Sequence, residues 1–426
     1  MGSRDKRFAS STPRDLVTSE MKMGGPFGCA AFAILFTAYT FFIALKCQMG
    51  AWDLFSIPEL PNRALLLDTK VTTCVVVWFL LQCAIYMSPV GGSMETGALL
   101  TSGVQHLYRA NALFALAINI FVLGTAVVFG YDVTRIAASL IQLVTSSITL
   151  CLIASVVLYL RGRRLQPSDR NPNGNKGNIV YDWFMGQELN PRWRNLDFKY
   201  VLFRSAIIGW ILINICNMVE HYQRYQSLNI TLLVLNAVQL YYVADYFYFE
   251  RGVIVSRDIV HEGLGYNILL QFVMIPFCFC IQTRFVASTN YQQSTWTVLS
   301  ITLVYVLGFY IYRVSNSEKN DFRKNPHDPK LSHLKTIATK SGKHLLISGW
   351  WGTCRHPNYL GDLIISLSYA LFTGVTHVLP YLGTVFLMLL LIDRERMDGE
   401  DCKRKYGPDW ERYCSIVKYR IIPWLY

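Results

Sequence analysis

The sequence predicts an all-α polytopic membrane protein, and its composition and charge pattern support this. Of its 426 residues, 52% are hydrophobic and only 16% are charged, whereas about a quarter of a soluble domain is charged. Long stretches without a charged residue recur along the whole chain. This composition excludes a disordered chain and a small disulfide-stabilised domain. The 11 cysteines are scattered without a C-x-x-C pair, so we expect no metal site and no disulfide framework.

The charge-free stretches define the expected membrane spans. The bilayer core is about 30 Å thick, so one spanning helix needs roughly 20 apolar residues. Stretches of about this length are 23–45, 71–94, 110–131, 136–160, 225–244, 263–283 and 285–312, together with 205–219, which extends backward through 200–203. The last stretch, 363–392, is interrupted by Gly374, His377 and Pro380. It is long for one crossing and short for two.

The distribution of basic residues indicates whether this last stretch crosses the membrane once or twice. If 363–392 forms a helical hairpin, the chain crosses ten times and 34 of its 40 Lys and Arg residues lie on one side. The positive-inside rule favours this arrangement and places both termini in the cytosol. The membrane topology then accounts for most of the formal charge of +12, and we expect no nucleic-acid partner. The sequence thus predicts a cytosolic tail (1–22), an N-terminal group of transmembrane helices with a cytosolic loop (23–204), and a C-terminal transmembrane catalytic region (205–426).

Ionisable residues near a span are candidates for function because they are costly there. In the span at 225–249, Tyr241 and Asp245 are four residues apart and share a helix face. His261 and Glu262 come just before the next span and can hold or deliver a proton. A satisfied hydrogen-bond network or an ordinary interfacial loop would explain the same residues.

Three segments on the predicted cytosolic side favour an anionic nucleotide. Lys319 and Arg323 are four residues apart, and a bound phosphate would relieve their repulsion. The segment 349–362, GWWGTCRHPNYLGD, combines stacking aromatic residues with Arg and Gly. In the C-terminal segment, Arg394, Asp398 and Lys405 fall on one helical stripe. Positive-inside anchoring and a helix rich in salt bridges are the alternatives. The sequence has neither a G-x-G-x-x-G fingerprint nor a Walker loop.

These motifs resemble those of a known family. LLISGWWGTCRHPNYLGDL (345–363) and KYGPDWERYCSIVKYRIIPWLY (405–426) resemble the signatures of the Δ14- and Δ7-sterol reductases and of the lamin B receptor membrane domain. FMGQELNPR (184–192) and DIVHEGLGYNILLQFVMIPF (258–277) match more loosely. The resemblance implies a ten-helix membrane bundle with a cytosol-facing nucleotide pocket and a membrane-facing sterol pocket. It also implies reduction of a sterol ring double bond with NADPH.

The resemblance further implies which residues bind the cofactor. The residues so matched are Lys319, Arg323, Leu346, Trp351, Asn358, Tyr359, Asp398, Cys402, Lys403, Arg404, Lys405, Tyr406 and Tyr413, and the same sequence blocks contain Arg355, His356, Asp362 and Arg394. Preference for NADPH follows from the resemblance and from the supply of cations, because a 2′-phosphate needs a cationic partner.

Departures from the family pattern concern the sterol side. Glu262-Gly263-Leu264-Gly265-Tyr266 replaces the usual Asp-Gly-Phe-Gly-Phe, and Arg204-Ser205-Ala206 replaces Arg-Pro-Gly. We favour reduction of a Δ14 bond, with a Δ7 bond as the alternative. A membrane methyltransferase of the isoprenylcysteine type also carries R-H-P-x-Y, and a sterol-binding protein without activity is a further alternative.

The expected chemistry is protonation of the alkene followed by hydride transfer from NADPH. The acid must stay protonated near neutral pH, as a tyrosine does, and the pocket must exclude water. We therefore predict Tyr241 as donor or relay, assisted by Asp245, His261 and Glu262. The sterol is expected to enter from the bilayer among the membrane lipids. The resemblance implies the endoplasmic reticulum membrane in a eukaryote, or the inner membrane in a bacterium.

Overall fold

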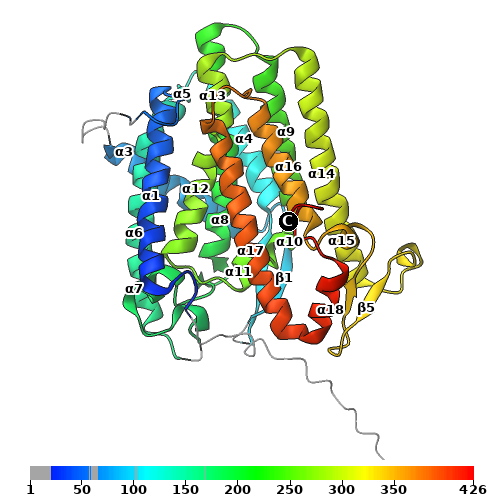
Figure 1. The fold of residues 1–426 in the computed structure, drawn as a ribbon. Helices are drawn as coiled ribbons and strands as arrows, with labels where there is room; N and C mark the ends of the chain where they lie inside the picture. The colour runs from blue at the N-terminus through cyan, green and yellow to red at the C-terminus, as the bar shows by residue number, and fades with distance from the viewer. Residues whose placement is uncertain (1–20, 57, 59–65, 101–102, 168) are drawn as a thin grey trace, which may run out of the picture. The chain divides into compact units, whose positions relative to one another are not determined.

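The computed structural model describes residues 21–56, 58, 66–100, 103–167 and 169–426. These residues form two compact units (Figure 1). Unit 1 consists of Ser294–Phe372 and Tyr381–Tyr426. Unit 2 consists of residues 21–293, with the gaps just given, and Thr373–Pro380.

Unit 2 is a bundle of long helices with short helices and hairpins at its ends. Its elements are α1 (Gly25–Met49), α3 (Thr69–Met87), β1 (Ser93–Leu99), β2 (Gln105–Ala110), α4 (Ala112–Val128), α5 (Thr134–Ala138), α6 (Leu140–Gly162), α7 (Ile179–Met185), β3 (Arg192–Trp193), β4 (Leu196–Asp197), α8 (Phe198–Tyr225), α9 (Ile230–Tyr248), α10 (Glu250–Ile254), α11 (Arg257–Val260), α12 (Tyr266–Phe279) and α13 (Ile281–Thr289). Helix α12 packs against α6 and α8 and lies at the centre of this unit. Strands β1 and β2 pair antiparallel, as do β3 and β4.

Unit 1 combines three long helices with a small hairpin and a folded tail. Its elements are α14 (Thr295–Lys324), β5 (Thr336–Ala338), β6 (His344–Leu346), α15 (Trp350–Thr353), α16 (Pro357–Leu371), α17 (Leu382–Tyr406) and α18 (Pro408–Ile416). Helix α16 packs on α14 and on α17. A Cβ atom at Gly361 would lie 2.5 Å from the backbone nitrogen of Tyr312, so glycine permits α16 to approach α14 this closely.

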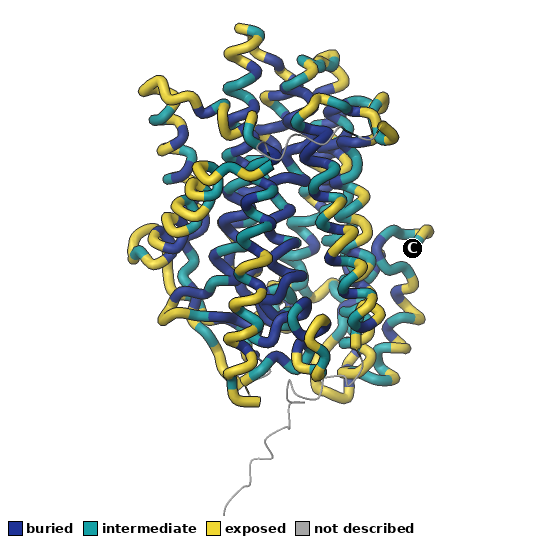
Figure 2. The backbone as a smooth tube through the Cα atoms, turned by 90° about the vertical axis from the view of Figure 1, so that its left-hand side faces the viewer, coloured by how far each residue is buried: buried dark blue, intermediate teal, exposed yellow. Residues whose placement is uncertain are grey.

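Capping residues define where the helices of both units begin. The side chain of Asp197 accepts a hydrogen bond from the backbone of Tyr200 at the start of α8. Asn229 and Ser294 cap α9 and α14 in the same way. Each cap satisfies a backbone N–H group that the helix leaves unpaired. Buried residues lie where the helices pack against one another, and exposed ones gather on outer faces and connections (Figure 2).

The helices confirm the predicted class, an all-α polytopic membrane protein. Among the described residues, seven helices are long and apolar enough to cross a membrane, and α4 is a shorter apolar helix. The stretch 363–392 divides where α16 ends at Leu371 and α17 begins at Leu382, as a hairpin requires. Each of the nine expected stretches contains a helix, and the count of ten crossings stays a prediction.

Candidate functional site

Aromatic and basic side chains gather in unit 1 where α14 ends and α15 begins. The ammonium group of Lys319 lies 3.6 Å from the ring centroid of Trp351. The indole of Trp351 donates to the backbone oxygen of Ser315 at 2.9 Å, which fixes the orientation of the ring. Leu346 and Trp351 are both buried in one cluster with Phe322. The cation–π contact and this packing hold Lys319 in one place.

The loop before α15 is held by a carboxylate that the sequence did not single out. Glu318 accepts a hydrogen bond from the backbone nitrogen of Trp350 at 3.1 Å. Gly349 has φ 63°, and a Cβ atom there would lie 2.6 Å from the Glu318 carboxylate. Only glycine tolerates both conditions, so Gly349 and Glu318 together set the position of the two tryptophans.

Helices α16 and α17 present a second group of predicted residues to each other. The hydroxyl of Tyr359 donates to the Asp398 carboxylate at 3.2 Å. The rings of His356 and Tyr359 stack with centroids 4.6 Å apart. Burial, and then the charges of Lys319 and Arg355, lower the pKa of His356 to about 3. His356 is therefore neutral at physiological pH. The Oδ1 atom of Asn358 is buried without a hydrogen-bond partner among the described residues.

Arg355 turns toward the C-terminal tail. Its guanidinium donates to the backbone oxygens of Val417 and Lys418 at 3.0 and 3.2 Å. It also lies 4.0 Å from Glu395, which pairs with Arg420 at 3.1 Å. These contacts give Arg355 a positioning role, because they tie the residues that precede α16 to the tail.

The basic residues at the end of α17 differ in their surroundings. Lys403 pairs with Glu411 at 3.5 Å, and both side chains are about two-thirds exposed. Arg404 pairs with Asp401. The ammonium of Lys405 lies 5.2 Å from the ring centroid of Tyr406. Among the described residues, Lys405 is the cation of this run that pairs with no carboxylate, which makes it the better candidate for an anionic ligand.

The sequence did not identify Lys343, which lies just before β6. The charge of Lys405, then burial, and further the charge of Arg323 lower the pKa of the Lys343 ammonium. Lys343 therefore lies close enough to Lys405 and to Arg323 for repulsion, which a bound anion would relieve. Lys343 belongs to a short polar hairpin without a motif, so its spacing in sequence carried no signal.

The other predicted cofactor residues are distributed over the same unit. Tyr413 is buried and stacks on Trp410 at 4.8 Å, and burial raises the pKa of its hydroxyl. Asp362 and Arg394 are partly buried on α16 and α17, and Cys402 is partly buried near the end of α17. All 17 residues that the resemblance implied thus lie in unit 1, on α14, α17, α18 and the segment from β6 through α16. Their cofactor role stays a prediction.

The predicted catalytic residues belong to unit 2. Tyr241 is 56% exposed on α9, and Asp245 on the same helix is partly buried. Glu262 lies after α11 and pairs with Arg257 at 3.4 Å, while the Lys199 ammonium donates to its backbone oxygen at 2.7 Å. His261 is partly buried beside it. Tyr241 and Asp245 therefore form one group and His261 and Glu262 another, on separate elements.

Comparison with known proteins decides the family. Residues 8–426 match the model of the Ergosterol biosynthesis ERG4/ERG24 family. The chain belongs to this sterol reductase family. It is 36% identical to the Delta(14)-sterol reductase TM7SF2 of Mus musculus over 97% of this chain and 100% of that protein. It is 34% identical to the Delta(14)-sterol reductase of Ascobolus immersus over 96% and 99%.

One relative is longer than this chain. The Delta(14)-sterol reductase LBR of Gallus gallus is 36% identical over 95% of this chain, which spans 64% of that protein's length. The match confirms the family that the motifs indicated. With its apolar helices, the chain is an integral membrane protein of the sterol reductase type. It favours a reductase over the methyltransferase alternative.

Proposed function

We propose that this protein reduces the Δ14 double bond of a sterol with NADPH. The observation that carries the proposal is the group of cations and aromatic rings in unit 1. Lys319 lies over Trp351 and feels the charge of Arg323, and Lys343 feels the charges of Arg323 and Lys405. The names of the relatives support the Δ14 position.

The residues of unit 1 fit a dinucleotide phosphate. Cations suit its phosphates, and the Asp398 carboxylate, held by Tyr359, suits a ribose hydroxyl. The buried and unpartnered Oδ1 atom of Asn358 can accept a hydrogen bond from an amide group. When bound, NADPH supplies a hydride for the sterol. The role of this chain is to hold the phosphates, orient the rings and keep water out.

The residues of unit 2 would supply the proton. An isolated alkene accepts a hydride poorly, so protonation to a tertiary carbocation comes first. Tyr241 is the proposed donor, because a phenol remains protonated at neutral pH, and Asp245 lies one turn away on the same helix face. Tyr241 is exposed, so a sterol that enters from the bilayer can reach it. We propose cytosolic termini and, in a eukaryote, the endoplasmic reticulum membrane.

Purified protein in lipid nanodiscs, incubated with NADPH and a panel of Δ7-, Δ14- and Δ24-sterols, tests this proposal. We expect the Δ14-sterol to gain two hydrogens in the mass spectrum, one of which comes from NADPH deuterated at the hydride position. Reduction of the Δ7-sterol alone would reassign the substrate. Saturable binding of S-adenosylmethionine without NADPH binding would refute the proposal.

A further inference from the structure

A column of buried polar side chains runs through unit 2. Spanning a membrane does not require such side chains. It is drawn from three helices, and each of its side chains is at most 8% exposed. The residues of this polar column are Asn214 and Asn217 on α8, Asn236 and Gln239 on α9, and Thr283 and Arg284 on α13. Spacing of three residues places each pair of α8 and α9 on one helix face. None of these residues belongs to the sites described above.

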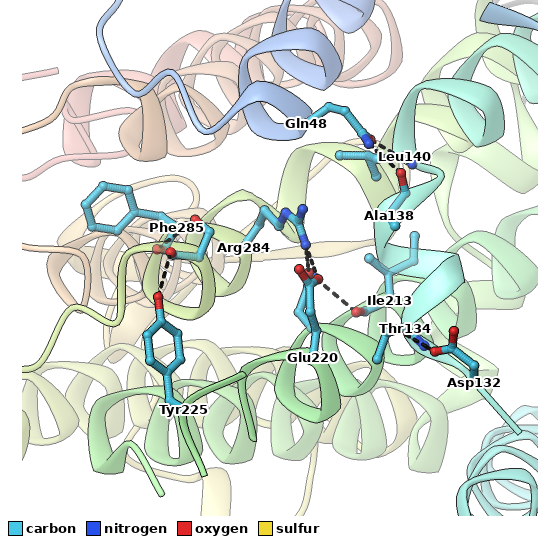
Figure 3. A network of polar contacts seen from close by, with 12 residues as sticks. Gln48, Asp132, Thr134, Ala138, Leu140, Ile213, Glu220, Tyr225, Arg284 and Phe285 are labelled. Atoms are coloured by element: carbon cyan, nitrogen blue, oxygen red, sulfur yellow. Dashed lines mark hydrogen bonds and ion pairs between the residues drawn. The ribbon is translucent and has the colours of Figure 1, made fainter. Parts of the chain in front are cut away.

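Hydrogen bonds join the polar column across all three helices. The amide of Asn214 donates to Gln239 Oε1 at 2.7 Å, and the hydroxyl of Thr283 donates to the same oxygen at 3.2 Å. The guanidinium of Arg284 donates to Asn217 Oδ1 at 3.0 Å. Arg284 also forms an ion pair with Glu220, toward which it extends in Figure 3. The hydrogen bonds thus form two groups, one around Gln239 and one around Arg284, which meet at the adjacent residues Thr283 and Arg284.

Three atoms of the polar column remain unpaired among the described residues. These are Asn214 Oδ1, Gln239 Nε2 and Arg284 Nε, and all are buried. A buried polar atom without a partner destabilises the fold, so a ligand that pairs with it is favoured. The set contains an acceptor and two donors, so its ligand must both donate and accept. Water does both, and buried water typically makes about three such bonds.

The polar column reaches the surface at the end of unit 2 that carries the α8–α9 connection (226–229). The side chain of Glu220 is 23% exposed there. The titratable groups that face the Arg284 guanidinium are Glu220 from α8, Cys47 from α1 and Cys280 at the start of α13. Glu220 neutralises Arg284, so the entrance carries no net charge that would repel a proton.

We propose that the polar column binds a chain of ordered water molecules that returns protons from the α8–α9 end to the sterol site. This inference rests on the proposed function. In each turnover a carbon–carbon π bond breaks, two C–H bonds form, NADPH is oxidised to NADP⁺, and one proton is taken from solvent. The positive-inside distribution predicts that the α8–α9 end is not cytosolic. Proton and hydride would then reach the sterol from opposite sides of the membrane.

Thr283→Val removes one hydroxyl from the polar column without changing the side-chain shape, and Thr40→Val is the matched control. Thr40 is equally buried in unit 2 but lies outside the polar column, and its hydroxyl bonds to the backbone oxygen of Phe36 within α1 and contacts the sulfur of Met274 on α12. For Thr283→Val we expect kcat to fall about tenfold and its solvent isotope effect to rise, with KM for both substrates unchanged. Thr40→Val should retain the kinetics of the wild-type protein.

Proteoliposomes that expose the NADPH site outward test the direction of proton entry. Raising the pH inside the vesicles should slow the wild-type protein, and Thr283→Val should respond less. Wild-type kinetics and an unchanged response in Thr283→Val would overturn the proposal. A higher KM for sterol with unchanged kcat would also overturn it, since the column would then bind the sterol hydroxyl. If Thr283→Val does not fold, Asn214→Leu takes its place.

Radiolytic hydroxyl-radical labelling provides a readout that does not depend on activity. Buried side chains beside bound water become oxidised, and we expect this at Trp210 and Cys280, one helical turn from Asn214 and Arg284. Cys29, which is equally buried, is the control. Protection of Trp210 and Cys280 would refute the water chain. Failure of the wild-type protein to reduce any sterol would instead refute the proposed function.

Discussion

The two units place their polar residues in different physical settings. In unit 1 the candidate residues lie near helix ends and connections, and cations such as Arg323, Lys343 and Lys405 are exposed. In unit 2 the polar column is buried between helices, and its side chains bond mainly to one another. These settings fit our proposals that unit 1 receives a charged ligand from water and that unit 2 handles neutral groups and protons away from water.

The difference also concerns how each arrangement is held. Unit 1 uses long-range tethers: Glu318 fixes the backbone of Trp350, and Glu395 joins the tail to Arg355. The polar column of unit 2 instead uses side chains on adjacent helices. Removal of a charge should therefore affect cofactor affinity in unit 1, and removal of a hydroxyl should affect the rate in unit 2. The following predictions test this division, beginning with the largest effect.

The double change Lys319→Ala/Arg323→Ala should have the largest effect. Each charge-assisted hydrogen bond contributes about 1.5–3 kcal/mol, so loss of both should weaken NADPH binding roughly 10³-fold. Titration of NADPH fluorescence in nanodiscs measures this affinity. Lys324→Ala, a change to an exposed neighbour at the end of α14, is the control. Equal affinities for the double variant and the wild-type protein would remove the phosphate role from α14.

Tyr241→Phe should lower kcat by about 100-fold or more, since a positioned acid contributes roughly 10²–10⁴ in rate. NADPH affinity should not change, because the residue belongs to unit 2. Tyr222→Phe on α8 is the matched control, because that tyrosine is 51% exposed, close to the exposed fraction of Tyr241. Single-turnover kinetics with saturating NADPH measure the step. Near-normal turnover would require another donor.

The features of the two units differ in how far the sequence could predict them. Many of the residues proposed to bind the nucleotide lie in runs of unusual residue types at 349–362 and 393–406, which both spacing and resemblance identify. The hairpin at 363–392 was predictable because charge and length leave few alternatives. The role of Glu395 was not predictable from its neighbours Arg394 and Arg396, because it pairs with Arg420 only when the C-terminal tail folds back onto α17. The polar column was equally hidden, since Asn214, Gln239 and Thr283 meet only after three helices pack.

Glu395→Gln should destabilise unit 1 by about 2 kcal/mol. Glu395 is 2% exposed, accepts from Arg420 and lies 4.0 Å from Arg355. Loss of one partner from a buried ion pair costs about 3–5 kcal/mol, and partial exposure of Arg420 reduces this figure. Thermal unfolding of the whole chain should show the loss, and NADPH affinity should fall with it. Glu400→Gln on the exposed side of α17 is the control, and identical unfolding of both variants would show that the tail is not tethered here.

The smallest effect concerns the pH dependence of NADPH binding. The charge of Lys405 lowers the pKa of Lys343, so Lys343 loses its proton at lower pH than an isolated lysine does. A bound phosphate favours the charged form and raises that pKa again, so binding should take up protons and weaken as pH rises through the lowered pKa. Lys343→Ala should reduce affinity only about two- to threefold near neutral pH, because the side chain is exposed, and should flatten the alkaline decline. Calorimetry in buffers of different ionisation enthalpy measures the proton uptake. If NADPH affinity declines with the same slope at alkaline pH in Lys343→Ala and in the wild-type protein, Lys343 lies apart from the phosphates. The anion site of unit 1 would then be restricted to the residues that the motifs identified.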